Sequence, residues 1–197
     1  MSYQLTRGAF DRRYLTVVET AVLSSRHLGA SPLGGEFVRT WGFSIVFRRS
    51  ELSRVVSDFP GLGLFFERAL LPSCNAFYVN PLVMTRGSRV DPHVDCRLVE
   101  AENVRIVPNL VSVFYVRADP RLKGGALKLQ LPSGRVLELP PATNELVHFV
   151  GSLVHSVGEV LDGGDVHGRI SLVCEQYNLE DGLLAGFPAF EVLSGRT

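Results

Sequence analysis

The chain from about residue 75 onward consists of short extended runs that are separated by turn residues. The runs are NAFYV, LVSVFYV, ALKLQL, RVLEL, ELVHFV, LVHSVGEV and RISLVCEQY. Their spacing of roughly 8–12 residues is typical of a β-sandwich or a β-barrel. Within this series, LKLQL-PSG-RVLEL predicts a hairpin in which Gly134 supplies a positive φ angle. We therefore expect a β-rich core over about residues 75–178.

The first 72 residues predict mainly helices. Apolar residues recur at helical spacing over Ala9–Leu28, although a strand within YLTVVETAVL stays an alternative. Two short helices are expected over 50–59 and 62–71, because a serine can cap the first and a proline follows each. Alternating apolar residues over 41–47 predict a strand with one buried face.

Length and composition favour one globular domain. The 197 residues are 46% apolar and 20% charged, which is enough for a sizeable core. We expect a helical support layer over 1–72, a β core over 75–178 and a tail over 179–197. The tail contains apolar residues that can dock on the body or on a second subunit, so a homodimer stays open.

Charge and cysteine content restrict the class of partner and the compartment. The formal net charge is zero, so the chain lacks a global positive field and nucleic acid is a poor first guess as substrate. The N-terminal segment MSYQLTRGAFDRRYL has no apolar stretch, which argues against a signal peptide or a membrane span. Three cysteines, Cys74, Cys96 and Cys174, lack zinc-type spacing, which fits a reducing cytoplasm in which most of these thiols are buried.

The segment DPHVDCRL places His93 and Asp95 two positions apart, where side chains on a strand share a face. A metal site needs a third ligand, and His155 is our choice because it opens an extended run. His148 reads as a packed strand histidine, and His167 reads as a solvated residue in a glycine-rich loop. Two imidazoles and one carboxylate form the facial triad of non-haem Fe(II) oxygenases, although zinc stays an alternative.

The order of these residues resembles a family. His93-Val94-Asp95, then a distant His155, then Arg169-Ile170-Ser171 is similar to the pattern of Fe(II)/2-oxoglutarate-dependent dioxygenases, and most similar to their prolyl-hydroxylase-like branch. VSVFYV, GGALKL, the hairpin and PPATNELVHF occur in the same order as in that branch. The resemblance covers about residues 75–178, which is half of the chain.

The resemblance implies a fold and a set of ligands. The fold would be α+β but mainly β: a double-stranded β-helix, or jelly roll, buttressed by N-terminal helices. Fe(II) would bind at one open end, with 2-oxoglutarate and O2 as co-substrates and ascorbate as a stimulating reductant. The guanidinium of Arg169 would pair with the distal carboxylate of 2-oxoglutarate, assisted by Ser171 and Tyr115. Tyr78 is a second tyrosine candidate at the pocket wall, and no catalytic residue is expected beyond the metal site.

The implied activity is hydroxylation of an unactivated C–H bond, with release of succinate and CO2. The acidic ligand Asp95 favours hydroxylation over halogenation, because halogenating relatives lack it. The substrate would be an amino-acid, peptidyl (including prolyl) or other small-molecule carbon. Thirteen residues separate His155 from Arg169, and CRLVEAENVRIVPN follows Asp95; both links are long, so substrate identity does not transfer.

Two other functions stay open, and one loop prediction follows from the resemblance. A cupin-type metal protein that does not use 2-oxoglutarate would need no Arg169. A non-catalytic jelly-roll binding module would not need the metal ligands. Segment 80–92 contains Pro81, Gly87 and Pro92 and leads into the metal ligands, so we expect it to be a mobile lid.

Overall fold

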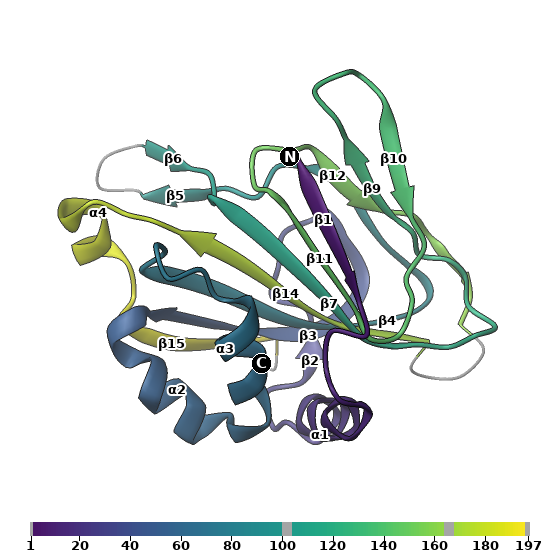
Figure 1. Cartoon of the computed structure of the whole chain (residues 1–197), viewed down its shortest axis with the longest axis horizontal. Helices are drawn as coiled ribbons and strands as arrows, with labels where there is room; N and C mark the ends of the chain where they lie inside the picture. Colours follow the sequence, from purple (N-terminus) through teal and green to yellow (C-terminus); the bar gives the residue numbers. More distant parts are fainter. Residues whose placement is uncertain (1, 100–103, 164–167, 196–197) are drawn as a thin grey trace.

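The computed structural model describes residues 2–99, 104–163 and 168–195. A strongly curled antiparallel sheet dominates it, and three helices lie together against one side of this sheet (Figure 1). The sheet order is β1-β11-β7-β14-β4-β12-β9-β10, with β3 added on β4 and both β2 and β15 added on β3. The predicted fold class, mainly β with a jelly-roll core, is confirmed.

The bounds of the elements follow the predicted runs closely over the β core. The helices are α1 (Arg12–Leu23), α2 (Leu52–Asp58), α3 (Gly63–Ala69) and α4 (Asp181–Gly186). The strands are β1 (Tyr3–Arg7), β2 (Gly29–Ala30), β3 (Phe37–Arg48), β4 (Ala76–His93), β5 (Arg97–Val99), β6 (Val104–Ile106), β7 (Leu110–Ala118), β8 (Lys123–Gly124), β9 (Leu127–Gln130), β10 (Val136–Leu139), β11 (Glu145–Val150), β12 (His155–Val157), β13 (Val160–Asp162), β14 (Arg169–Tyr177) and β15 (Phe190–Ser194).

The predicted hairpin is confirmed. Strands β9 and β10 pair in antiparallel register, from Leu127 opposite Leu139 to Gln130 opposite Val136. Gly134 has a φ of 80° at the turn, and its N–H donates to the Leu131 carbonyl. A residue with a Cβ would be strained in this conformation, which explains the glycine.

Strand β14 separates the two main cores. Its even-numbered residues Ile170, Leu172 and Cys174 are fully buried and face the layer that contains the helices. Its odd-numbered residues, from Arg169 to Tyr177, face the opposite side, because side chains alternate along a strand. A second apolar cluster lines the inside of the curled sheet: Met84, Val90, Val111, Val113, Tyr115, Leu127, Leu129, Val147, Phe149, Leu153, Val157 and Val160.

The N-terminal region forms the expected helices but is not only a helical layer. Helices α1, α2 and α3 match the predicted pieces, and the Tyr14 hydroxyl joins two of them by accepting the N–H of Phe65 at 2.8 Å. The strand over 41–47 is confirmed as part of β3, but the expectation of one buried face is wrong: residues 42–47 are all buried, and Trp41 is exposed. Residues 3–7 form β1, which pairs with β11, so the chain start adds a strand that periodicity did not predict.

The lid prediction for 80–92 is wrong, because this segment is part of the 18-residue strand β4. Pro81 packs closely against Gly42 of β3. A Cβ at position 42 would lie 2.3 Å from the Pro81 carbonyl oxygen, so a glycine there leaves room for Pro81. Gly87, with a φ of 83°, lies in an irregular stretch where β3 and β4 lose register. Ser88 closes this bulge, since its hydroxyl donates to the Arg39 carbonyl and accepts the Thr85 N–H.

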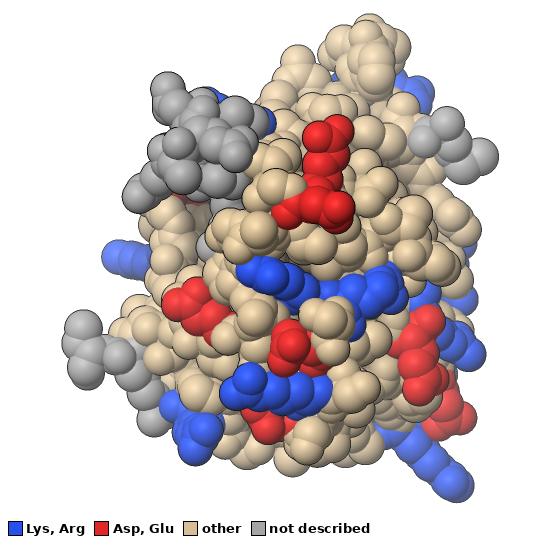
Figure 2. Space-filling view, turned by 90° about the vertical axis from the view of Figure 1, so that its left-hand side faces the viewer, with Lys and Arg blue, Asp and Glu red and all other residues tan. Residues whose placement is uncertain are grey.

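The C-terminal tail docks on the body. It forms α4 and then β15, which pairs with β3 from Phe190 opposite Phe47 to Ser194 opposite Phe43. Figure 2 shows the face that includes α4 and the β5–β6 hairpin, where acidic and basic residues lie interspersed over the described surface. Among the described residues, no helix combines the length and the apolar character needed to cross a bilayer.

Candidate metal centre

The structure brings His93, Asp95 and His155 together. His93 is the last residue of β4, His155 is the first residue of β12, and these two residues are paired across the strands. Asp95 lies just beyond β4, with one carboxylate oxygen 3.2 Å from Nε2 of His93 and the other 3.4 Å from Nε2 of His155. One potential ligand atom from each residue lies within 4.8 Å of the other two.

Backbone carbonyls fix the orientation of both imidazole rings. Nδ1 of His93 lies 2.8 Å from the Asp91 carbonyl, and Nδ1 of His155 lies 3.1 Å from the Leu153 carbonyl. A carbonyl oxygen only accepts, so Nδ1 carries the proton in each ring. Nε2 of each ring is then the nitrogen left to bind a metal ion, and without an ion a proton on Nε2 of His93 can donate to Asp95. Such carbonyl contacts fix the tautomer of metal-binding histidines in proteins.

The two imidazoles differ in their protonation. Burial disfavours the charged form of His93, but hydrogen bonds to Asp95 and to the Asp91 carbonyl outweigh burial and raise its pKa. In His155 burial dominates and lowers the pKa. His155 therefore favours the neutral form that binds metals, while Asp95 stabilises a proton on His93 that a cation would displace.

This donor set fits a divalent cation. The group contains two imidazole nitrogens and a carboxylate, and Oδ2 of Asp95 is buried with no hydrogen-bond partner among the described residues. A buried carboxylate oxygen without a partner is costly, and a metal ion would satisfy it. Two histidines and one carboxylate on one side of an ion are the ligands of non-haem Fe(II) sites.

A narrow inner cavity leads from the metal centre to Arg169. Its lining includes His93, Asp95, His155 and Arg169, together with apolar side chains such as Leu127. The cavity volume is about 40 Å³. Arg169 is 2% exposed, so a cationic group lies at the closed end of this cavity.

Three buried polar atoms at that closed end have no hydrogen-bond partner among the described residues: Nε of Arg169, the hydroxyl of Tyr115 and the hydroxyl of Ser171. Ser171 and Tyr115 are paired across β14 and β7, and the guanidinium carbon of Arg169 lies 4.9 Å from the centre of the Tyr115 ring. Burial raises the pKa of Tyr115 and lowers that of Arg169. Three donors around one buried charge fit a carboxylate, which accepts from all of them.

The backbone of Gly125 orients Arg169. Nη1 of the guanidinium donates to the Gly125 carbonyl at 2.7 Å, and Gly125 has a φ of 67°. This contact leaves the Nε edge of the guanidinium for another acceptor. The GGALKL segment that contains Gly125 is therefore adjacent to the cation-bearing end of the cavity.

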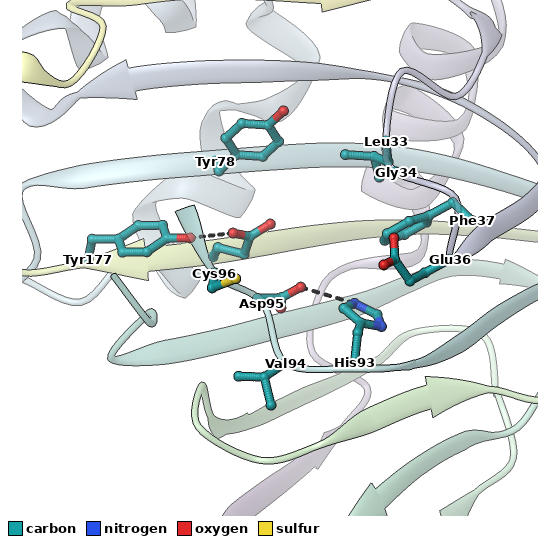
Figure 3. A pocket seen from close by; sticks show the side chains of 11 residues that line it. Leu33, Gly34, Glu36, Phe37, Tyr78, His93, Val94, Asp95, Cys96 and Tyr177 are labelled. Carbon is teal, nitrogen blue, oxygen red and sulfur yellow. Dashed lines mark hydrogen bonds and ion pairs between the residues drawn. The ribbon is translucent and has the colours of Figure 1, made fainter. Parts of the chain in front are cut away.

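A wider outer cavity of about 480 Å³ opens on the other side of the metal centre. Figure 3 shows Tyr78 and Tyr177 on one side of Asp95, with Glu36 and Phe37 on the other. The full lining is Leu33, Gly34, Glu36, Phe37, Tyr78, His93, Val94, Asp95, Cys96, Glu175 and Tyr177.

The structure separates Tyr78 from the other predicted oxoacid-binding residues. Tyr78 is paired with Glu175 on β14, whereas Arg169 is paired with Met84. The two pairs are six residues apart along β14, which is about 20 Å at ~3.3 Å per residue. Tyr78 lines the outer cavity and does not line the inner one.

The other histidine predictions have different outcomes. His148 lies away from the triad, with Nδ1 2.8 Å from the Ser112 hydroxyl, as expected for a packed strand histidine. His167 lies outside the described residues.

Sequence reasoning missed Glu175 and Asn80, which line the inner cavity, and Glu36, which lines the outer one. The period of two along β14 could have found Glu175, because it shares the strand face of Arg169 and Ser171. Asn80 and Glu36 had no comparable signal. Asn80 lies in the segment that we expected to be a lid.

No model of a protein family matches the chain, and no curated protein matches it by sequence. Solved structures do match. A prolyl-4-hydroxylase from Pseudomonas putida is 16% identical, with a TM-score of 0.59 over 91% of this chain and 94% of that one. A prolyl hydroxylase from Trichoplax adhaerens, in complex with a hypoxia inducible factor peptide, is 13% identical, with a TM-score of 0.59 over 90% and 84%.

A third solved structure is HygX from Streptomyces hygroscopicus with nickel, 2-oxoglutarate and hygromycin B bound. It is 12% identical, with a TM-score of 0.54 over 89% of this chain and 82% of that one. At these identities the likeness shows the fold. The jelly roll implied by the sequence resemblance is therefore the fold of this chain.

Proposed function

We propose that this protein is an Fe(II)- and 2-oxoglutarate-dependent oxygenase that hydroxylates a C–H bond. The observation that carries the proposal is the inner cavity, which has the His93–Asp95–His155 group at one end and the buried guanidinium of Arg169 at the other. A molecule that binds a metal at one end and presents a carboxylate at the other matches both ends. 2-Oxoglutarate has this chemistry.

Each residue has a specific task in this proposal. His93, Asp95 and His155 would hold Fe(II). Arg169 would bind the distal carboxylate of 2-oxoglutarate, with the hydroxyls of Ser171 and Tyr115 donating to the same group; their orphaned atoms support this assignment. When bound, Fe(II) would couple the oxidation of 2-oxoglutarate by O2 to succinate and CO2 with insertion of the second oxygen atom into a substrate C–H bond.

The protein itself would position the reactants and exclude water. Apolar side chains of Leu127, Val157 and Val113 line the inner cavity between its two polar ends. The cavity is narrow, so binding of 2-oxoglutarate requires these side chains to move apart. Once bound, the co-substrate would lie in an apolar channel, where charged interactions are stronger than in water.

The outer cavity is the proposed substrate site. Its volume of about 480 Å³ lies in the range of roughly 300–1,000 Å³ that small-molecule sites occupy. Tyr78 belongs to this side of the metal in our proposal. The volume of this cavity fits a substrate that is an amino acid, part of a peptide or another small molecule.

Each of the two alternative functions leaves one feature of the site unexplained. A cupin-type metal protein without an oxoacid leaves unexplained why a guanidinium is buried at the closed end with an orphaned Nε. A binding module without chemistry leaves the converging Nε2 atoms of His93 and His155 unexplained.

For the compartment, we propose the cytoplasm, because the three cysteines are free thiols.

The test is turnover of 2-oxoglutarate to succinate in the presence of Fe(II), O2 and ascorbate. Binding of Fe(II) and 2-oxoglutarate to the protein is measured in parallel without O2. The signal is the visible absorption band that appears when 2-oxoglutarate chelates Fe(II). We expect the band with the wild type, and its loss with Asp95→Ala and with Arg169→Ala. A wild-type protein that binds Fe(II) but gives neither the band nor succinate would contradict the proposal.

A further inference from the structure

We infer that the outer edge of β15 binds an extended peptide segment of a partner protein. The segment adds a strand to the sheet and places an apolar side chain in a cavity beside that edge. This docking surface lies outside the metal centre and does not depend on the proposed function. Two observations carry it: the direction of the backbone groups along β15, and the cavity that the helices form next to them.

Strand β15 ends the sheet on one side. It pairs with β3 from Phe190 opposite Phe47 to Ser194 opposite Phe43, and no other described strand pairs with it. Figure 1 shows β15 along the margin of the sheet, next to α2. Proline residues and bulges commonly protect such edges from pairing with another chain, and β15 has neither.

Three residues of β15 direct their backbone N–H and C=O groups away from β3. The N–H of Arg48 donates to the Ala189 carbonyl at 2.9 Å, so these two residues form a hydrogen-bonded pair. Hydrogen-bonded and non-hydrogen-bonded pairs alternate along an antiparallel ladder. Phe190, Val192 and Ser194 are therefore in non-hydrogen-bonded pairs, and their backbone groups point to the outer edge. An added strand can pair with all three.

A cavity of about 390 Å³ lies beside this edge. Phe190 and Val192 form its wall on β15, while Ala21 of α1 and Phe59 at the end of α2 form apolar walls on the helical side. Phe190 and Val192 are only partly buried, so apolar surface remains for a ligand to cover. Alternate side chains of an added strand point to this side, and one of them can enter the cavity.

The charges around the cavity balance. Among the described residues that line it, Arg26 and Asp58 carry opposite full charges, and both are exposed. Arg54 lies nearby, with its guanidinium carbon 4.9 Å from the centre of the Phe190 ring and its Nη1 3.9 Å from Glu51. A balanced rim does not favour a strongly anionic ligand such as nucleic acid. Backbone groups along an edge and an apolar cavity together fit a polypeptide.

The helical layer favours a single segment over a second copy of this chain. If two β15 edges paired about a two-fold axis, both helical layers would lie on the same face of the joined sheet. They would then compete for the space beside the paired edges. A single extended segment brings no such layer and fits between β15 and the helices.

The test uses peptides that differ in one side chain. The probes are acetylated and amidated heptapeptides, Thr-Val-Thr-X-Thr-Val-Thr, in which X is leucine or glycine. Their binding to the full chain is followed by two-dimensional NMR. We expect shifts at the amides of Phe190, Val192 and Ser194. The leucine peptide should bind at least about tenfold more tightly than the glycine peptide, because the cavity buries its side chain.

Methylated peptides test the pairing itself. The N–H groups of alternate residues in a strand point to opposite edges. Methylation of one alternate set of peptide amides should therefore abolish binding, whereas methylation of the other set should preserve it. Equal affinities of the two methylated peptides would contradict strand addition. This comparison needs no change to the protein, so it decides the question even where a variant does not fold.

A proline variant then locates the edge. Val192→Pro removes an outward N–H and should weaken binding of the leucine peptide by about tenfold. Val136→Pro on β10 is the matched control and should leave the affinity unchanged. Val136 is 53% exposed, and the Leu131 N–H donates to the Arg135 carbonyl, so the N–H of Val136 also points outward from a sheet edge.

Three results would overturn the inference. They are no binding by either unmethylated peptide, equal binding of the leucine and glycine peptides, and shifts on β10 or β1 instead of β15. Light scattering of the free chain, recorded at the same concentrations, tests the other occupant. A dimer that the leucine peptide dissociates would also overturn the inference, because the edge would then bind a second copy.

Discussion

The guanidinium carbon of Arg169 lies 4.9 Å from the centre of the Tyr115 ring, and both side chains are completely enclosed. Each also has a polar atom with no partner among the described residues. A charged group is expensive to bury, and the ring face compensates for only part of that cost. This pair is therefore best explained as one side of an anion site.

Arg169→Ala should weaken binding of 2-oxoglutarate by roughly 100-fold or more, because loss of one partner of a buried ion pair costs about 3–5 kcal/mol. Binding of the metal should change little, since Arg169 does not contact the triad. Calorimetry with 2-oxoglutarate and with Mn²⁺ measures both. Arg117→Ala is a matched control on the neighbouring strand, where its guanidinium contacts Glu19. An equal loss of both affinities would argue against the assigned task.

Tyr115→Phe should have opposite effects on stability and on binding. Removal of a buried hydroxyl without a partner should leave the free energy of unfolding unchanged or raise it by up to ~1 kcal/mol. Affinity for 2-oxoglutarate should fall by about tenfold, which corresponds to one hydrogen bond to a charged group. Denaturant titration and calorimetry test the two effects. A clearly less stable variant would show that the hydroxyl has a structural partner.

His155→Gln should reduce the affinity for divalent metal by more than about 100-fold, because changes merely adjacent to a ligand already cost roughly 10–100-fold. His148→Gln is the matched control: it is also a strand histidine, but it contacts Ser112 and lies outside the triad. Competition with a fluorescent chelator gives both affinities. Similar values for the two variants would remove His155 from the proposed ligand set.

Protonation of His148 should destabilise the fold at mildly acidic pH. Burial lowers its pKa below the ordinary 6.5, so between the two values the unfolded chain binds more protons than the folded one. The free energy of unfolding should therefore fall as the pH drops below about 6.5 and level off below the folded pKa. The pH slope of denaturant stability should be shallower in His148→Gln. An unchanged slope would show that His148 does not contribute.

Gly42→Ala should destabilise the protein by about 1–3 kcal/mol, because the new Cβ would lie 2.3 Å from the Pro81 carbonyl oxygen on β4. Gly182→Ala in α4 is the control, since a Cβ there meets nothing within 4 Å. It should be neutral or slightly stabilising. Thermal or denaturant unfolding measures both. Equal stability of the two variants would mean that β3 and β4 shift apart without cost.

The sequence allowed the grouping of His93, Asp95 and His155 to be predicted. The i, i+2 spacing of His93 and Asp95 placed two side chains on one side of the chain, and the position of His155 at the start of an extended run placed the third on a strand. Arg169 and Ser171 followed from the family resemblance, and the period of two placed them on one strand face. Arg169 and Ser171 share a face because both lie on β14, whereas Asp95 lies beyond the end of β4 and approaches His93 from the segment that follows the strand.

Other features depend on contacts between distant segments and were not predictable. Pro81 and Gly87 indicated a loop, yet pairing with β3 and β14 makes the segment a strand, with Gly42 providing room for the Pro81 carbonyl. Residues 3–7 form a strand only because β11 offers a free edge. Tertiary pairing therefore overrode local propensity in both places.

Strand β14 has a consequence for how such proteins diversify. Its nine residues present Arg169 and Ser171 near one end and Glu175 and Tyr177 near the other, all on one face. In the proposed enzyme, mutation at 175 or 177 can alter which molecule is accepted while oxoacid chemistry survives. Homologues should therefore differ more at the second pair than at the first, and new specificities can arise within one lineage by changes at a single strand end.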